Sequence, residues 1–430
     1  MHSNPDAARI FLPVVLLLVT ASFGGVLFQR LRMPKVIGEI VGGILLGPTL
    51  LGRYDPDLYR ELFLNNESFM VTFYLLGLVL LMFASGFEID PGIAKDDRRT
   101  ILTITVTSTV VPILFGWGAT YFFDLTNLMG DARHLLALRI VIAIAIAITS
   151  IPVISKIFFD LNIIQTRFAK VVLSIATLHD IILWVLLSIA AGLVGSRGVS
   201  GMTISVQAGV TILVFGLILI LVPIVLRFLQ RHQVNLIPDQ FASSFLFLLL
   251  LIFVVLANWL QMNIIFGAFL AGVVIGFIKN RHFDDLKAHV KSISFAFFIP
   301  VYFAMVGLKL DLVNQFDPYF CGIFLLFTIL IQGITVFGTA RALNHRWMTS
   351  FNLAMAMNAR GGPCIVLATV AYDLRIISLS FFTTLIVLAV VTSLIAGAWL
   401  RFVVSSGIPL YDDDTKQASK RFSRQQFHDA

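Results

Sequence analysis

Long apolar runs alternate with short polar stretches along almost the whole chain. Most runs are long enough for an α-helix to cross the hydrocarbon layer of a membrane, which takes about 20 residues. We predict thirteen membrane-spanning segments, of which the second and ninth are short and rich in glycine. They lie near residues 9–28, 36–52, 68–87, 100–122, 135–158, 168–194, 203–228, 240–259, 263–279, 289–308, 318–342, 348–372 and 376–402.

The composition agrees with this pattern. Of the 430 residues, 58% are hydrophobic and 13% are charged, whereas soluble domains carry about 25% charged residues. Cys321 and Cys364 both fall in apolar segments, so we expect no disulfide. We find no phosphate-binding glycine loop, no metal-spaced His/Cys set and no nucleophile motif. We therefore expect no enzyme activity, no cofactor and no binding to nucleic acid.

Basic residues mark one side of the membrane. They cluster after the odd-numbered segments, for example at Arg30, Arg32 and Lys35, and are sparse after the even-numbered ones. The positive-inside rule places the basic side in the cytoplasm. We therefore predict a multi-pass protein of the cell (inner) membrane, in contact with its lipids, with the N-terminus outside. The polar residues 405–430 are predicted to form a disordered cytoplasmic tail.

Two of the predicted segments contain helix-breaking residues. Thr149-Ser150-Ile151-Pro152 interrupts the fifth segment, and Asn358-Ala359-Arg360-Gly361-Gly362-Pro363 interrupts the twelfth. Glycine and proline both disfavour the interior of a helix. If segments 1–6 and 8–13 are repeats, each repeat breaks at its fifth member. Interrupted segments at corresponding positions indicate an inverted-repeat transporter with its binding site near the midplane.

Ionisable residues fall in or beside these interrupted segments. Asp180 lies ten residues after Lys170 in the sixth segment, about 15 Å along a helix, and so near the membrane midplane. A carboxylate there costs at least about 2.5 kcal/mol, which favours a functional role over a structural helix–helix hydrogen bond. Arg360 is predicted at a similar depth, where it either shapes the electric field or caps carbonyls freed by the break; the two roles are compatible.

Seven blocks of sequence carry a family resemblance. In chain order they are Met33–Pro48, Ser85–Asp90, Thr149–Ser155, Leu178–Trp184, Phe266–Gly272, Pro300–Leu308 and Asn358–Gly361. Together they resemble the motifs of the monovalent cation:proton antiporters, which are sodium/hydrogen exchanger-like proteins. The resemblance is to the branch of bacterial potassium-efflux antiporters and plant cation/H⁺ exchangers, and it spans nearly all of the apolar part of the chain.

The resemblance implies an all-α sodium/proton antiporter-like fold with inverted repeats and two broken, crossing helices. It implies a transmembrane antiporter domain over residues 1–404 that forms a homodimer. The scaffold helices would lie at about 9–87 and 240–308, the core helices at about 100–194 and 318–402, and a linker helix at about 203–228. The core would move against the scaffold in an elevator-like manner.

The chain departs from the family pattern at two positions. The residue before the essential aspartate is usually Asp or Asn, but here it is His179. Many members carry a midplane lysine on the eleventh helix, and Thr335 falls at that place. A protonated His179 would balance the charge of Asp180 in place of the lysine. The alternative is a neutral histidine bonded to a neighbouring helix.

These residues suggest a mechanism in which two ions compete for one carboxylate. Burial disfavours a charged carboxylate, so H⁺ and a monovalent cation, Na⁺ or K⁺, would exchange at Asp180. The candidate ion- or proton-binding residues are Asp180, His179, Thr149, Ser150 and Thr177, with Asn358 and Arg360 setting the local charge. Three alternatives remain open: a proton-coupled transporter of another solute on the same fold, a non-transporting membrane sensor, and an ion channel.

Overall fold

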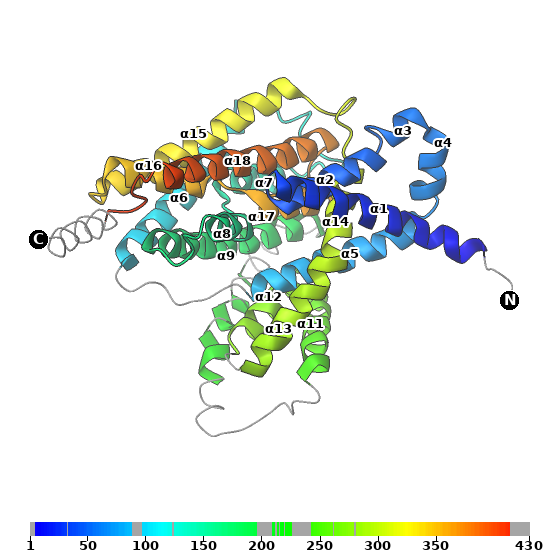
Figure 1. Cartoon of the computed structure of the whole chain (residues 1–430), viewed down its shortest axis with the longest axis horizontal. Helices are drawn as coiled ribbons and strands as arrows, with labels where there is room; N and C mark the ends of the chain where they lie inside the picture. Colours follow the sequence, from blue (N-terminus) through cyan, green and yellow to red (C-terminus); the bar gives the residue numbers. More distant parts are fainter. Residues whose placement is uncertain are drawn as a thin grey trace, which may run out of the picture. The chain divides into compact units, whose positions relative to one another are not determined.

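In a computed structural model, the protein is α-helical, and no β-strand occurs in the part of the chain that is described (Figure 1). The structure describes residues 5–31, 33–87, 97–122, 124–195, 242–260, 262–278 and 281–412, with short stretches between 209 and 225. Within these ranges, nine helices are long and apolar enough to cross a membrane. The protein is therefore a multi-pass integral membrane protein, as predicted.

Most of the predicted spans coincide with a helix. The unbroken helices of ten or more residues are α1 (Pro5–Arg30), α2 (Lys35–Leu46), α5 (Glu67–Gly86), α6 (Arg98–Ala119), α9 (Arg167–Gly195), α11 (Ala242–Trp259), α12 (Ile264–Gly276), α13 (Arg281–Ile293), α14 (Ile299–Leu308), α15 (Pro318–Ala342) and α18 (Leu379–Ser405). Short helical pieces are α3 (Leu51–Tyr54), α4 (Pro56–Tyr59), and the π-helical turns η1 (Arg60–Leu64) and η4 (Ser294–Phe298). The seventh predicted span, 203–228, lies largely outside the described residues.

The two predicted helix breaks are confirmed. The fifth span consists of α7 (Leu135–Ala147) and α8 (Ile151–Asp160), and the twelfth of α16 (Trp347–Met357) and α17 (Gly361–Asp373). Between α7 and α8 the backbone is extended at Ile148 and Ser150. In each case a single apolar stretch of sequence forms two half-helices separated by three residues whose backbone groups need partners.

The described chain forms two compact units. Unit 1 comprises Met1–Pro91, Trp184–Phe316 and Asp373–Thr383, and unit 2 comprises Gly92–Leu183, Asp317–Tyr372 and Thr384–Ala430. The division of the chain into a fixed scaffold, a linker helix and a moving core stays a prediction. Of the predicted tail, residues 405–412 are described and belong to unit 2, with Ser405 as the last residue of α18, and residues 413–430 lie outside the described ranges.

Unit 1 is built by close helix packing through small residues. In this unit α1 packs on α2, α12 on α5, and α14 on both α2 and α5. A Cβ atom on Gly43 would overlap the backbone of Ala304, and one on Gly307 would overlap the backbone of Ile40. Since lipid tails are as apolar as leucine, membrane helices associate by such close contacts rather than by a hydrophobic drive between them.

Unit 2 holds both broken helices. In this unit α6 packs on α7 and α15, and α15 also packs on α16. A hydrogen bond of 2.9 Å from Thr339 Oγ1 to Thr107 Oγ1 joins α15 to α6. Fully buried apolar side chains from α8, α9 and α16, among them Phe158, Phe168 and Met357, form its core. This packing fixes the breaks inside the unit.

Candidate functional site

The two helix breaks are joined directly by hydrogen bonds. The backbone N–H of Ser150 donates to the carbonyl of Ala359 over 2.7 Å, and the hydroxyl of Thr149 donates to the carbonyl of Met357 over 2.7 Å. Both Thr149 and Ser150 are fully buried. A helix end leaves backbone groups without partners, and here each break supplies part of what the other lacks. The two interrupted segments of the chain therefore meet in unit 2, as predicted.

Local chemistry explains where each second half-helix begins. Ser150 Oγ accepts from the Val153 N–H over 3.4 Å and so caps α8. Gly361 opens α17 with φ of +39°, and an added Cβ atom there would overlap Val153. Only glycine meets both demands at low cost. Its N–H donates to Ser393 Oγ over 3.1 Å.

Arg360 lies at the second break and is completely buried. Its guanidinium donates to the carbonyls of Ala145 (3.2 Å) and Ile146 (2.9 Å) at the end of α7. It also donates to the carbonyl of Thr328 on α15 (3.2 Å) and to the side-chain oxygen of Asn358 (3.1 Å). Arg360 thus satisfies carbonyls that the first break leaves without helical partners, and it places a positive charge at the crossing.

His179 connects the α9 helix to the crossing. This side chain is 4% exposed. Its Nε2 lies 2.9 Å from Ser108 Oγ on α6, and its Nδ1 lies 3.4 Å from Thr149 Oγ1. Both hydroxyls donate to backbone carbonyls, of Ile104 and Met357 respectively. A neutral ring can therefore donate to one of the two hydroxyl oxygens, and an imidazolium can donate to both.

Asp180 and Thr177 are buried on the same helix. Asp180 is 5% exposed and Thr177 is 9% exposed. The Thr177 hydroxyl donates to the carbonyl of Leu173 over 2.8 Å, which leaves its oxygen lone pairs available. The structure thus buries all of the predicted site residues in unit 2, and it links Thr149 to His179, and Asn358 to Arg360, by hydrogen bonds.

Sequence reasoning did not single out several buried polar residues of this unit, among them Ser108, Ser393 and Gln332. Gln332 on α15 is completely buried, and among the described residues neither its amide oxygen nor its amide nitrogen has a hydrogen-bond partner. It lies one turn from Thr328, whose carbonyl binds Arg360. Thr335, which the alignment of motifs selected, is only half-buried and donates to the Ile331 carbonyl of its own helix over 2.7 Å.

Gln332 also lies next to the second break. A Cβ atom added to its neighbour Gly333 would come 3.4 Å from the side-chain nitrogen of Asn358. Burying an amide without partners costs about 1–3 kcal/mol. A buried amide without a hydrogen-bond partner among the described residues calls for an explanation.

Comparisons with known proteins agree with this architecture. The model of the transmembrane sodium/hydrogen exchanger family matches residues 17–406. The chain is 26% identical to the Na⁺/H⁺ antiporter NhaS4 of Synechocystis over 393 residues, which cover 89% of this chain and 94% of that protein. It is 27% identical to K⁺/H⁺ antiporter 1 of Saccharomyces cerevisiae over 91% of this chain, but spans only 46% of that relative.

A solved structure shares the fold. The sodium proton antiporter MjNhaP1 of Methanocaldococcus jannaschii superposes with a TM-score of 0.68, covering 93% of this chain and 98% of that one at 12% identity. At that identity the likeness concerns the fold alone. The family match covers nearly the whole chain and includes both helix breaks and Asp180. The protein therefore belongs to the sodium/hydrogen exchanger family of membrane proteins.

Proposed function

We propose that the protein exchanges a monovalent cation, Na⁺ or K⁺, for protons, and that both bind in turn at Asp180. The observation that carries this proposal is the burial of that carboxylate on α9, one residue from His179, which contacts the first helix break. A charged carboxylate is costly to bury in a membrane protein, so this position favours a bound proton or a bound cation. The names of the relatives NhaS4 and K⁺/H⁺ antiporter 1 agree with such exchange.

Oxygen atoms of the first helix break and of α9 are the proposed further ligands of the cation, because hard cations prefer oxygen. They are the hydroxyl oxygens of Thr149 and Thr177 and the carbonyls near Ser150. The side-chain oxygen of Gln332 is a further ligand in this proposal, since it is buried and has no partner among the described residues. Amide and hydroxyl oxygens can replace the water that a monovalent ion loses on entry.

His179 is proposed to adjust the charge of the site. Its contacts to Ser108 and Thr149 are complete only when both ring nitrogens carry protons. Burial opposes that charge, and a charged carboxylate at Asp180 would favour it. A proton that moves on and off His179 would therefore couple to cation binding at its neighbour. The charge of Arg360 is already shared among carbonyls and Asn358, which suits a fixed, non-titrating role.

The wider proposal follows the family resemblance. The core helices would move against the scaffold helices in an elevator-like manner, so that the site opens to each side in turn. The protein would work as a homodimer in the lipids of the cell membrane. By the positive-inside rule, the basic residues after the odd-numbered spans would lie in the cytoplasm, so the N-terminus would be outside and the tail in the cytoplasm.

A second candidate is a proton-coupled transporter of another solute on the same fold. Two uncharged positions favour it: Thr335 and Gln332 stand on the helix where many members of the family carry a lysine. The two candidates differ in whether a monovalent cation alone can drive proton movement.

Proteoliposomes with an internal pH-sensitive dye separate them. We expect dye recovery after addition of Na⁺ or K⁺, and no recovery from Asp180→Asn. Asp160→Asn is the matched control, because Asp160 belongs to the same unit but lies in an exposed ion pair with Lys156. If adding monovalent cations does not change the internal pH, cation–proton exchange is contradicted and the second candidate is favoured.

A further inference from the structure

The chain that follows α18 folds back onto unit 2. Within residues 406–412, Leu410 is 6% exposed and Tyr411 is 2% exposed. The side-chain nitrogen of Asn352, a completely buried residue on α16, lies 3.4 Å from the Pro409 carbonyl and 3.3 Å from the Leu410 carbonyl. Trp399 on α18 donates to the oxygen of the same amide over 3.0 Å. Residues 406–412 are thus an ordered part of the unit.

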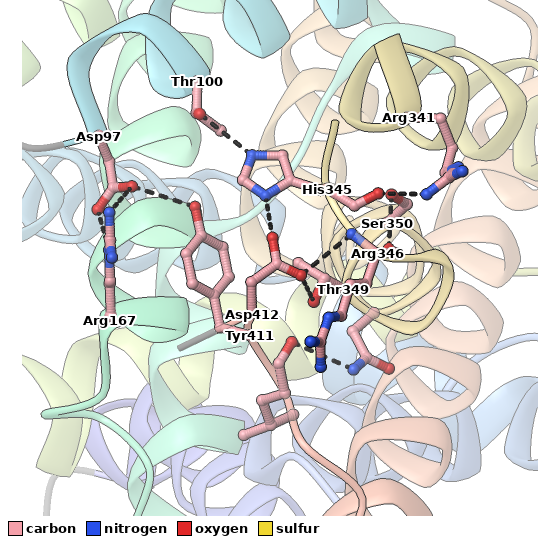
Figure 2. A network of polar contacts seen from close by, with 12 residues as sticks. Asp97, Thr100, Arg167, Arg341, His345, Arg346, Thr349, Ser350, Tyr411 and Asp412 are labelled. Atoms are coloured by element: carbon pink, nitrogen blue, oxygen red, sulfur yellow. Dashed lines mark hydrogen bonds and ion pairs between the residues drawn. The ribbon is translucent and has the colours of Figure 1, made fainter. Parts of the chain in front are cut away.

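Tyr411 contacts an ion pair that joins the first turns of two helices. Its hydroxyl donates to Asp97 over 3.2 Å, and Asp97 directly precedes α6. Arg167, the first residue of α9, donates to both oxygens of Asp97 over 2.7 and 2.8 Å, and its guanidinium lies 5.4 Å from the Tyr411 ring (Figure 2). Burial and then the Asp97 carboxylate raise the pKa of Tyr411, so its hydroxyl remains a donor.

Asp412 makes the second set of contacts. One carboxylate oxygen accepts from the Arg346 N–H (3.0 Å) and the Thr349 hydroxyl (2.9 Å), both at the start of α16. The other oxygen lies 2.7 Å from Nδ1 of His345. The remaining ring nitrogen of His345 lies 3.2 Å from Thr100 Oγ1 on α6 (Figure 2). Residues 411 and 412 therefore reach the first turns of α6, α9 and α16.

The charge of Asp412 does not change near neutral pH. Burial raises the pKa of Asp412, but the hydrogen bonds from His345, Arg346 and Thr349 outweigh it, so the net pKa is lower than usual. This carboxylate therefore stabilises the folded protein fully at pH values above about 3.9, its pKa in the unfolded chain. The stabilisation is lost only as the pH falls through its lower pKa in the folded protein. Any change in these contacts between pH 5 and 8 must come from its partner.

The ring in contact with Asp412 is that of His345, and histidine is the side-chain type that ordinarily changes charge between pH 5 and 8. Asp412 contacts the His345 ring directly. Asp97 lies on the other side of Tyr411 and is paired with Arg167. Two more arginines complete the charged surroundings. Arg341 donates to the His345 carbonyl, and Arg346 follows it in the chain. The arginines oppose a further positive charge and the aspartates favour it. A protonated ring forms a charge-assisted bond to Asp412, which is stronger than a neutral one.

We propose that residues 406–412 are a pH-sensitive latch on the ends of the two helices that carry the proposed ion site. The latch is tighter when His345 is protonated and looser when it is neutral. It restrains α6, which carries Ser108, and α9, which carries His179 and Asp180. Acid pH on this side of the protein therefore slows exchange and alkaline pH releases it. The effect on exchange rests on the proposed function, whereas the latch itself does not.

The first test does not involve transport. Hydrogen–deuterium exchange of peptides covering 406–412 is measured in the purified full chain at pH 6 and pH 8, corrected for the intrinsic effect of pH. We expect the amides to be about threefold better protected at pH 6, as a partly exposed ion pair allows. His345→Gln and Asp412→Asn should remove this difference, and Asp160→Asn should keep it. Equal protection of the wild type at both pH values, or a difference that survives in His345→Gln, overturns the latch.

The second test measures cation-driven exchange in proteoliposomes against pH. Relative to the wild type, the midpoint of His345→Gln should move to lower pH by about half a unit, while its maximal rate is retained. An active His345→Gln protein with the wild-type midpoint overturns the restraint on exchange. If the wild-type protein shows no cation–proton exchange, the proposed function is contradicted. The latch is then tested by hydrogen–deuterium exchange alone.

Discussion

Replacing Arg360 tests whether the crossing of the broken helices depends on one guanidinium. In Arg360→Ala the carbonyls of Ala145, Ile146 and Thr328 lose their charged partner. A hydrogen bond to a charged group contributes about 1.5–3 kcal/mol. Water that enters the space would satisfy part of the loss, so we expect about 4 kcal/mol of destabilisation, near the low end of the sum for three such bonds.

That loss should be visible in two assays on the purified protein. Thermal unfolding in detergent should shift down by about 5 °C, and cation-driven proton exchange should fall at least about tenfold, which corresponds to about 1.4 kcal/mol. Arg360→Lys should recover part of the stability but little of the exchange. A lysine keeps the positive charge, but its compact ammonium group cannot donate to several separated carbonyls as the planar guanidinium does.

The control is Arg99→Ala, because Arg99 is an exposed arginine of the same unit. The reasoning is refuted if Arg360→Ala melts and transports like Arg99→Ala. If Arg360→Ala lowers stability alone and its folded fraction exchanges ions at the full rate, the guanidinium supports the fold and does not contribute to the ion site.

Two further substitutions probe the surroundings of Asp180. His179→Asn removes a titrating ring from the contact with Ser108, so the pH profile of exchange should change; an unchanged profile in proteoliposomes would exclude His179 from the mechanism. Gln332→Leu replaces a buried amide without a partner among the described residues by an apolar group of similar size. Stability should hold or rise, while the apparent KM for the cation should increase severalfold; an unaltered KM would mean that the amide does not bind the ion.

The helix breaks were predictable because their signal is local. Proline and glycine disfavour helix interiors wherever they occur, so Thr149–Pro152 and Asn358–Pro363 marked the ends of α7 and α16 without any knowledge of the fold. The burial of Asp180 was predictable for a similar reason, since a single carboxylate in a long apolar run must face protein or water. The first prediction used only the backbone preferences of proline and glycine, and the second used only chain position and the cost of burying a charge.

Gln332 was missed because nothing in its local sequence sets it apart. One glutamine in an apolar helix is compatible with exposure, burial or an interhelical bond, and only the neighbours on α6, α7 and α16 decide which. Thr335 was chosen by its spacing from Gly338 and Thr339, a criterion that ignores which face of α15 is buried. The structure shows that the polar residue on the buried face comes one turn earlier.

The fold of residues 406–412 also escaped prediction. Ile408, Leu410 and Tyr411 form an apolar run of only four residues with Pro409, too short for a periodic pattern. The burial of Leu410 and Tyr411 depends on Asn352 and Asp97, which lie far away in the chain. Contacts of this kind, which join distant loops through single polar side chains, leave no periodicity in the sequence.

The most direct test of the central claim is cation–proton exchange by Asp180→Asn in proteoliposomes, measured with Na⁺ and with K⁺ at several pH values. The amide is nearly the same size as the carboxylate but can neither titrate nor attract a cation with full charge. We predict that the variant folds, as judged by gel filtration and thermal unfolding, and exchanges neither cation at any pH while Asp160→Asn remains active. Full exchange by a folded Asp180→Asn protein would contradict the account.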